Sequence, residues 1–306
     1  MHIKFFKKKS NLVVLDIGSR VLKASEIMET KSGYSLQHFG MVDIAYGAIE
    51  EGVIKDADKI AASIRKLFNE NSFKTQNVAV SIGGYSVIVK KISVQTMTEK
   101  QLQESINSEA EQHIPFDISD VNLDYQMLGE AENNPNQMGV LLVAVKKEVI
   151  NSYVDLIQMA GLNPCVIDID AFALQNIFEL NYAPEDENVA LIDIGASKTS
   201  LNILKGNSSV FIRDVALGCG LINRNIVSLI DCSYEEAEQL KYRDQPDRIS
   251  PDDIKEIISS VTDDWCNEIR QALDFFYSTN PDAQIKRIML SGRGDYIHES
   301  RELSAV

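Results

Sequence analysis

One nine-residue pattern occurs twice in this chain, and it restricts the folds open to the sequence more than any other feature. Residues 11–19 read Asn-Leu-Val-Val-Leu-Asp-Ile-Gly-Ser, and residues 188–196 read Asn-Val-Ala-Leu-Ile-Asp-Ile-Gly-Ala. Each copy is a run of β-forming residues that ends in Asp-Ile-Gly. Glycine permits a tight turn whose amides can face an anion. The repeat predicts two related sheets that hold a phosphate chain between them, although Asp-x-Gly also occurs in ordinary hairpins.

Length and charge narrow the class of protein. A chain of 306 residues can bury a large core and is expected to form two domains or more. Its net charge of −15 argues against nucleic acid as the main partner. The chain has no run of eighteen apolar residues, so the sequence predicts no membrane-spanning helix. The N-terminus lacks the apolar core of a signal peptide. The four cysteines have no C-x-x-C spacing, so we expect reduced, structural thiols.

The alternation of elements predicts a subdomain inserted into the first half. Strands at 11–15, 21–28 and 78–82 and a helix at 56–69 precede Gly83-Gly84. The next eighty residues then predict a strand, a helix, two strands and a helix, with a polar loop at 129–136. Thr98 and Gln101 have capping-box spacing at the start of the first of these helices. The second half predicts strands at 200–204, 209–213 and 285–290 and a long amphipathic helix at 254–276.

Two sets of motifs carry a resemblance to known proteins. The paired Asp-x-Gly hairpins and the late turn Leu290-Ser291-Gly292-x-Gly294 resemble the actin/Hsp70/sugar-kinase ATPase fold. Residues 92–126 are more specific, with Ile-Ser-Val, Gln-Leu, Ser-Glu-Ala-Glu-Gln-His-Ile-Pro-Phe and Val-Asn-Leu-Asp-Tyr-Gln in order. This stretch resembles the PilM family of type IV pilus assembly proteins, as does Tyr-Glu-Glu-Ala-Glu-Gln-Leu-Lys at 234–241.

The resemblance implies an α/β actin-like ATPase fold with two ribonuclease-H-like lobes. The first lobe comprises residues 1–83 and 163–186. The second comprises residues 187–306 and includes a helical subdomain at 231–280. The inserted β-α-β-β-α subdomain, residues 84–162, would bind a partner. Relatives continue for several tens of residues past the equivalent of Val306, so the resemblance implies a second lobe that is incomplete at its C-terminal end.

The resemblance also implies a site for ATP and Mg²⁺ between the two lobes. Asp16 and Asp193 would act on Mg²⁺ through its waters, which suits a cation that keeps water ligands. Asp170 would orient the attacking water. The residues expected to bind the nucleotide are Asp16, Gly18, Ser19, Lys23, Asp193, Gly195, Ala196, Thr199, Gly218, Gly220, Ser291, Gly292 and Gly294.

Several of these residues have a plainer interpretation. Lys23 fits an ordinary strand lysine, and Asp170 fits the N-cap of the helix that follows it. Asp168 is expected to be structural. His113 fits a helix end better than a metal ligand, because no second histidine lies at ligand spacing. The apolar stripe at 254–276 fits a core-facing helix better than a coiled coil.

The function implied by the resemblance is a cytoplasmic scaffold of pilus assembly. It would bind ATP, with slow hydrolysis or none, and would lie at the cytoplasmic face of the inner membrane through its partners. Those partners would be the N-terminal peptide of PilN, pilus motor ATPases and further copies of the chain. An FtsA-like cytoskeletal protein is the alternative. A sugar or acetate kinase is a third reading, for which no acidic base can be assigned.

Overall fold

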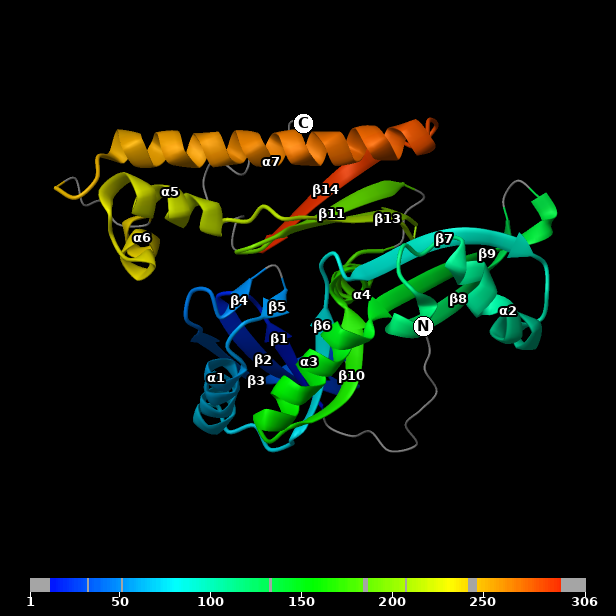
Figure 1. Cartoon of the computed structure of the whole chain (residues 1–306), viewed down its shortest axis with the longest axis horizontal. Coiled ribbons are helices and arrows are strands. Elements are labelled where there is room, and N and C mark those ends of the chain that lie inside the picture. Colours follow the sequence, from blue (N-terminus) through cyan, green and yellow to red (C-terminus); the bar gives the residue numbers. More distant parts are fainter. Residues whose placement is uncertain are drawn as a thin grey trace. The chain divides into compact units, whose positions relative to one another are not determined.

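The chain divides into two compact units, of which the first contains a five-stranded and a three-stranded sheet and the second contains a four-stranded sheet (Figure 1). The first unit holds the chain up to Ile17 together with Val21–Ile44 and Gly52–Asp170, and the second holds Gly18–Arg20, Ala45–Glu51 and the chain from Ala171. The structure is a computed structural model that describes residues 12–31, 33–50, 52–131, 134–183, 187–206, 208–241 and 247–292.

The sheet of the first unit has the strand order β10-β6-β1-β2-β3. Its strands are β1 (Val13–Ile17), β2 (Val21–Thr30), β3 (Gly33–Asp43), β6 (Asn77–Ile82) and β10 (Asn163–Ile169). β1 runs parallel to β6 and antiparallel to β2, so the first copy of the repeat is the central strand and one arm of a hairpin. Val13, Leu15 and Ile17 are buried, whereas Asp16 lies on the opposite, exposed face because side chains alternate along a strand.

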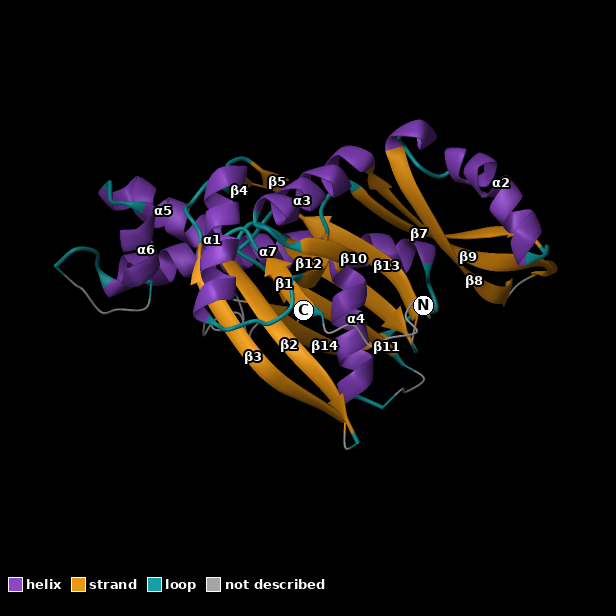
Figure 2. Ribbon diagram, turned by 90° about the horizontal axis from the view of Figure 1, so that it is seen from below, coloured by secondary structure: helices purple, strands orange, loops and turns teal. Residues whose placement is uncertain are grey.

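Two helices cover the buried face of this sheet (Figure 2). Helix α1 (Ala57–Glu70) begins at Asp56, whose side chain accepts a hydrogen bond from the Lys59 amide at 3.1 Å. It packs on β2 and β3, while α3 (Lys147–Met159) packs on β10 and on α1. The Arg65 guanidinium donates to the Met159 carbonyl at 2.7 Å and ties the two helices together. A short ribbon of β4 (Ile49–Glu50) and β5 (Val53–Ile54) precedes α1.

The inserted elements form a second sheet with its own core. Strands β7 (Val87–Gln95), β8 (Val121–Ala131) and β9 (Asn134–Lys146) pair in the order β7-β9-β8, and a 3₁₀ turn, Ile118–Asp120, precedes β8. Helix α2 (Glu99–Glu111) packs Leu102 and Ile106 against one face of this sheet. The predicted capping box at Thr98 and Gln101 is confirmed, with both reciprocal hydrogen bonds present.

The predicted polar loop at 129–136 is wrong. β8 continues to Ala131 and β9 begins at Asn134, so most of this segment is a hairpin of two paired strands. Gly129 has a φ of +90° and lies where the register shifts, which lets the strand continue past an irregularity. The polar composition reflects the exposure of this hairpin and not a lack of regular structure.

The sheet of the second unit has the order β13-β12-β11-β14 and is covered on both faces. Its strands are β11 (Asn188–Ile194), β12 (Thr199–Lys205), β13 (Ser208–Val215) and β14 (Ile285–Gly292). On one face, Val189, Leu191 and Leu204 contact residues of α4 (Asp170–Asn181). On the other face lie α5 (Gly220–Ile230), α6 (Tyr234–Leu240) and α7 (Pro251–Thr279).

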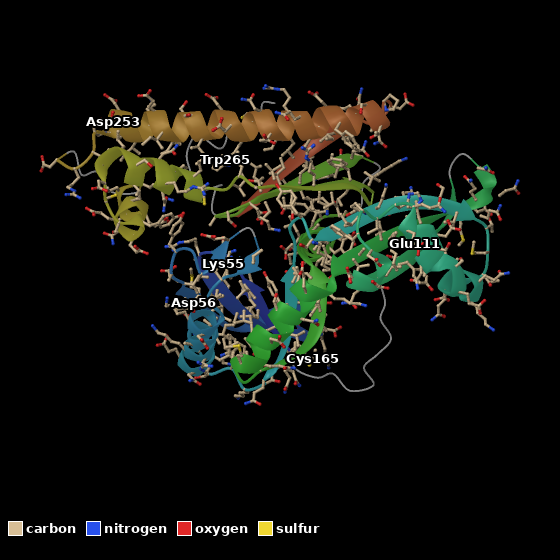
Figure 3. The ribbon with its side chains drawn as sticks, viewed as in Figure 1. Lys55, Asp56, Glu111, Cys165, Asp253 and Trp265 are labelled. Carbon is tan, nitrogen blue, oxygen red and sulfur yellow. The ribbon has the colours of Figure 1, made fainter. Side chains whose placement is uncertain are left out.

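Helix α7 supplies the largest side chains of that core. It begins after Ser250, whose hydroxyl accepts from the Asp253 amide at 3.0 Å. Trp265 (labelled in Figure 3) and Phe276 are fully buried and belong to the cluster that includes Ile192 and Ile194. The stripe predicted at 254–276 is therefore a core-facing helix surface. No helix among the described residues is long and apolar enough to cross a membrane.

Candidate functional site

The structure gathers most of the predicted second-half residues around the turn that joins β11 to β12. Asp193 is the penultimate residue of β11, and its Oδ1 accepts a hydrogen bond at 2.8 Å from the hydroxyl of Ser291, the residue paired with it on β14. Thr199 begins β12, and its hydroxyl donates to the Leu217 carbonyl at 2.6 Å. Gly294 lies outside the described residues.

Three glycines allow backbone segments to meet at this turn. A Cβ on Gly218 would lie 2.5 Å from the carbonyl carbon of Ala196, and one on Gly220 would lie 2.7 Å from its oxygen. Gly292 has a φ of +94°, and a Cβ there would overlap the backbone of Ile194. Larger residues at these positions would push the segments apart, so the glycines are required for the packing of the turn itself.

The amides at the N-terminus of α5, beside the predicted binding residues Gly218 and Gly220, are already paired within the chain. The Cys219 and Gly220 amides donate to the carbonyls of Gly195 and Ala196 at 2.9 and 2.8 Å. The next two amides, of Leu221 and Ile222, donate within the helix entry. Gly218 and Gly220 therefore hold the turn in place, and an anion would have to find its donors elsewhere.

Unpaired amides do occur in the turn between β11 and β12. The Gly195 amide donates to the Lys198 carbonyl at 2.9 Å, but the amides of Ala196 and Ser197 have no hydrogen-bond partner among the described residues. Adjacent, unpaired amides in a turn form a concavity that suits a phosphate oxygen. Ser197 was not predicted; its only sequence signal is its place two residues after the repeated glycine.

The turn of the first hairpin also has unpaired amides, but the side chains around it are different. Between β1 and β2, the amides of Gly18 and Ser19 also lack partners within the described chain. Asp16 and Lys23 face each other across the hairpin, and Nζ lies 2.7 Å from Oδ2. Their side chains are 51% and 45% exposed, so this ion pair is a surface feature. Lys23 is thus tied to the neighbouring aspartate and placed beside the turn.

A second carboxylate, that of Asp168, lies near the same end of the strands of the first sheet as Asp16. Leu15 pairs with Val80 and Asp168 pairs with Ser81, so Asp16 and Asp168 fall in one row across the parallel strands. Burial raises the pKa of the Asp168 carboxyl, the Ile169 amide opposes the shift by donating to it at 2.8 Å, and the Asp170 carboxylate adds to it. Asp170 itself is the first residue of α4.

A buried polar cluster in the second unit was not predicted as part of a site. Asn223 of α5 is fully buried, and its Nδ2 donates to Glu238 of α6. Lys241 Nζ lies 3.1 Å from the same carboxylate, with a side chain only 3% exposed. The Asn223 Oδ1 has no partner among the described groups. A buried amide oxygen without a partner is costly unless a ligand or water completes it.

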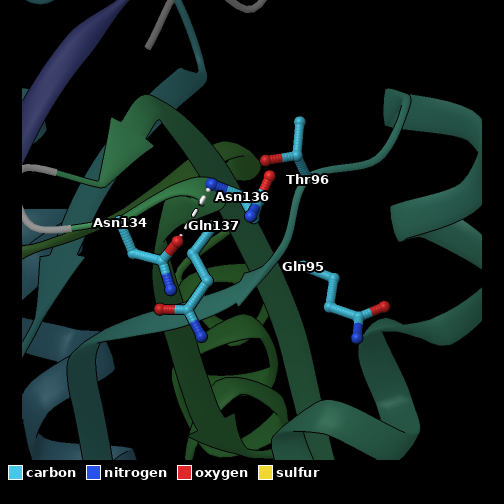
Figure 4. A pocket seen from close by; sticks show the side chains of 5 residues that line it. All are labelled: Gln95, Thr96, Asn134, Asn136 and Gln137. Atoms are coloured by element: carbon cyan, nitrogen blue, oxygen red, sulfur yellow. Dashed lines mark hydrogen bonds between the residues drawn. The ribbon is translucent and has the colours of Figure 1, made fainter.

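A cavity lies away from all of these residues. It measures about 530 Å³ and lies at the far end of the inserted sheet, lined by Gln95, Thr96, Asn134, Asn136 and Gln137 (Figure 4). The side chains that line it are uncharged, and the backbone N–H of Asn136 already donates to Asn134 Oδ1 at 3.0 Å. None of the predicted site residues lines it. No cluster of three metal-ligating side chains occurs within the described ranges.

Comparison with solved structures defines the class of protein. One chain of a PilM–PilN type IV pilus biogenesis complex is 25% identical, with a TM-score of 0.84 over 97% of this chain and 86% of that chain. MreB 5 of Spiroplasma citri, solved with AMPPNP, is 11% identical with a TM-score of 0.50, and 97% of this chain and 96% of that chain are covered. The fold is therefore that of the actin-like ATPases, which typically bind nucleotide, as predicted.

The family follows from the sequence comparison. Residues 14–304 match the family described as type IV pilus assembly protein PilM, and the chain belongs to that family. The cell division protein FtsA of Bacillus subtilis (strain 168) is 22% identical over 252 residues, which cover 75% of this chain and 57% of FtsA. The chain thus spans a little over half the length of that relative. The predicted resemblance to the PilM family is confirmed.

Proposed function

We propose that this chain is a nucleotide-binding scaffold of type IV pilus assembly. The observation that carries the proposal is the pair of turns with unpaired amides, Gly18–Ser19 and Ala196–Ser197, in a member of the PilM family. The four amides would donate to phosphate oxygens of ATP. Lys23 would exchange its ion pair with Asp16 for a phosphate. Mg²⁺, held by Asp16 and Asp193 through its waters, would neutralise phosphate charge.

Isothermal titration with Mg·ATP tests the binding step. We expect saturable binding, and we expect Lys23→Met and Asp193→Asn each to weaken it about tenfold or more, because each removes a charge-assisted contact. Lys31→Met is the matched control, since Lys31 is an exposed lysine that follows the far end of β2. Absence of binding, or equal effects of the Lys23 and Lys31 substitutions, would contradict the proposal.

The scaffold role requires a partner, which we propose to be the cytoplasmic N-terminal peptide of PilN. The solved relative is a PilM–PilN complex. The peptide would lie between the first lobe, residues 1–83 and 163–186, and the inserted subdomain, residues 84–162. At this junction Tyr85 is exposed, and β7 pairs only with β9 among the described strands, so an extended peptide could add to its free edge. Through PilN the chain would sit at the cytoplasmic face of the inner membrane.

Peptide binding can be measured directly. A fluorescent PilN N-terminal peptide should bind with saturation, and Tyr85→Ala should weaken it severalfold. Tyr34→Ala is the control, because Tyr34 is equally exposed but lies on β3 at the other side of the first sheet. No binding to the unmodified chain would remove this part of the proposal and leave nucleotide binding intact.

Hydrolysis is proposed to be slow or absent. Asp170, at the start of α4, would orient a water if hydrolysis occurs. Phosphate release measured over hours should stay below one turnover per minute. Brisk turnover that Asp170→Ala abolishes would show instead that the chain is an active ATPase.

The similarity to FtsA supports a second candidate, an actin-like cytoskeletal protein. This candidate predicts polymers on addition of Mg·ATP, whereas the scaffold proposal predicts small assemblies at most. Light scattering and sedimentation decide between them.

A further inference from the structure

Three residues that are far apart in the sequence form one stacked cluster in the second unit. The rings of Tyr46 and Tyr234 lie 3.9 Å apart and 19° from parallel. The guanidinium carbon of Arg20 lies 4.6 Å from the Tyr234 ring centre and 6.0 Å from that of Tyr46. All three belong to the same compact unit, because Gly18–Arg20 and Ala45–Glu51 group with it.

The cluster connects two of the glycine turns. Arg20 directly follows Gly18 and Ser19, whose amides lack partners in the described chain. The Tyr234 hydroxyl lies 2.8 Å from where a Cβ on Gly220 would be, so the ring is packed against the entry of α5. The stack therefore includes Arg20, which follows the Gly18–Ser19 turn, and contacts Gly220, which packs against the Gly195–Ala196 turn.

The chemistry of the stack favours a fixed arrangement. Tyr234 is buried, and burial raises its pKa to about 12, although the Arg20 charge acts in the opposite direction. The ring is therefore neutral at any pH at which the protein works. A planar guanidinium stacks on an aromatic face more effectively than a lysine ammonium does. Tyr46 is 48% exposed, so its ring can be removed without opening the core.

We propose that Arg20, Tyr46 and Tyr234 are positioning residues for the phosphate-binding turn at Gly18–Ser19. This proposal rests on the proposed nucleotide binding. A glycine-containing turn with unpaired amides samples many backbone conformations, and ordering it costs free energy when a ligand binds. The stack holds the residue after the turn, so part of that cost is met before the nucleotide arrives. The guanidinium acts by stacking its plane on the Tyr234 ring, which fixes the position of Arg20. No contact between Arg20 and the phosphate is required.

The test measures Mg·ATP affinity by isothermal titration in a set of variants. Tyr46→Ala should raise Kd about fivefold to tenfold, the range expected for loss of one aromatic contact. Arg20→Lys, which keeps the charge and loses the plane, should raise Kd about as much. Because the two residues act in one stack, the double variant should be little worse than the worse single variant. Tyr234→Phe keeps the ring and should bind within twofold of the unmodified chain.

The matched control is Tyr182→Ala. Tyr182 is 42% exposed and stacks on Phe178 at 4.9 Å in the same unit, and this stacking partner belongs to α4 and to neither turn. It should lower thermal stability about as much as Tyr46→Ala and leave Kd unchanged. Equal effects of the two substitutions on Kd would overturn the proposal, as would an Arg20→Lys variant with unaltered affinity, because charge alone would then suffice.

Failure of the positioning role is distinguishable from failure of nucleotide binding. If the unmodified chain binds no Mg·ATP, the proposed function fails. If it binds and Lys23→Met weakens binding while Tyr46→Ala and Arg20→Lys do not, only the positioning role fails.

Discussion

The two Asp-x-Gly hairpins have nearly the same sequence but are held in different ways. In the second hairpin, backbone atoms of Gly195 and Ala196 accept hydrogen bonds from Cys219 and Gly220, and Asp193 accepts one from Ser291. In the first hairpin, Asp16 is bound to Lys23 by an ion pair whose two members are about half exposed. The second turn is held by close packing of main chain, whereas the strands beside the first turn are linked by a surface charge pair.

This difference separates stability from ligand binding. Backbone packing tolerates no added atoms, so a larger residue in place of Gly218, Gly220 or Gly292 at the second turn should unfold the unit before it affects a ligand selectively. A surface ion pair contributes little to folding, so changes at the first turn should leave stability intact and act on the ligand. The same motif would thus supply a structural anchor in one unit and an adjustable contact in the other.

The largest expected effect is that of Gly218→Ala. The new Cβ would lie 2.5 Å from a backbone carbon of Ala196, which cannot move without breaking the turn. We expect a loss of about 3 kcal/mol in the free energy of unfolding. Urea titration followed by the fluorescence of Trp265, the chain's single tryptophan, reports on this unit.

Gly206→Ala is the control for the cost of placing alanine at a glycine position when the new Cβ meets no close contact. Gly206 has a φ of +57° and nothing within 4 Å of a Cβ, so the substitution should cost only about 1 kcal/mol. Similar losses for both variants would mean that the close contact at Ala196 is not what holds the second turn.

A smaller effect is expected for Ser291→Ala. It removes the donor of the 2.8 Å hydrogen bond to the half-buried Asp193, and a hydrogen bond to a charged group contributes about 1.5 kcal/mol or somewhat more. The same urea titration measures it, with the exposed Ser260→Ala on α7 as control. If the two serine variants are equally stable, Asp193 does not depend on β14 for its placement.

Asp168→Asn should stabilise the first unit in a pH-dependent way. Burial raises the pKa of this carboxyl in the folded state, so its charged form is disfavoured by folding at neutral pH. The folded state is therefore favoured when the carboxyl is protonated, and this advantage is lost as pH rises through the raised pKa. At pH 7 the asparagine variant should have a larger free energy of unfolding than the unmodified chain. This difference should shrink as the pH falls toward 3.8, the ordinary pKa of an aspartate. Urea unfolding followed by circular dichroism between pH 4 and 8 measures it; a gain that does not vary with pH would contradict it.

The smallest effect on stability is expected for Lys23→Met. Loss of a half-exposed ion pair should change the free energy of unfolding by less than about 0.5 kcal/mol, and 1 M salt should reduce the difference further. The variant should nevertheless bind Mg·ATP more weakly, which Lys31→Met should not. A loss of stability comparable to that of Gly218→Ala would erase the distinction between the two hairpins.

Local patterns were sufficient for most of the fold. Repeated runs of β-forming residues located β1 and β11, helical spacing located α1 and α7, and the capping box at Thr98 located the start of α2. The failure at 129–136 has a physical cause, since polar residues on an exposed hairpin look like a loop when only hydrophobic periodicity is considered. The predicted lobe boundaries stay predictions.

The site was less accessible to sequence reasoning, because its details depend on contacts between distant residues. The repeat located both turns, but nothing local indicated that the first amides of α5 are already used by Gly195 and Ala196. The buried cluster of Asn223, Glu238 and Lys241 joins two helices, and the stack of Arg20, Tyr46 and Tyr234 joins three separate segments. Such groupings follow from tertiary packing, which no single window of sequence encodes.

Helix α7 has a consequence for how the molecule can approach a lipid surface. At 1.5 Å per residue its 29 residues span about 44 Å, and one side of this length is buried. The exposed side carries more acids than bases. Its exposed acids are Asp252, Asp253, Glu256, Asp263, Asp264 and Asp274, and its exposed bases are Lys255 and Arg270. An anionic bilayer repels such a row of carboxylates within a Debye length, so a membrane-bound partner should hold the molecule with this helix turned toward the solvent.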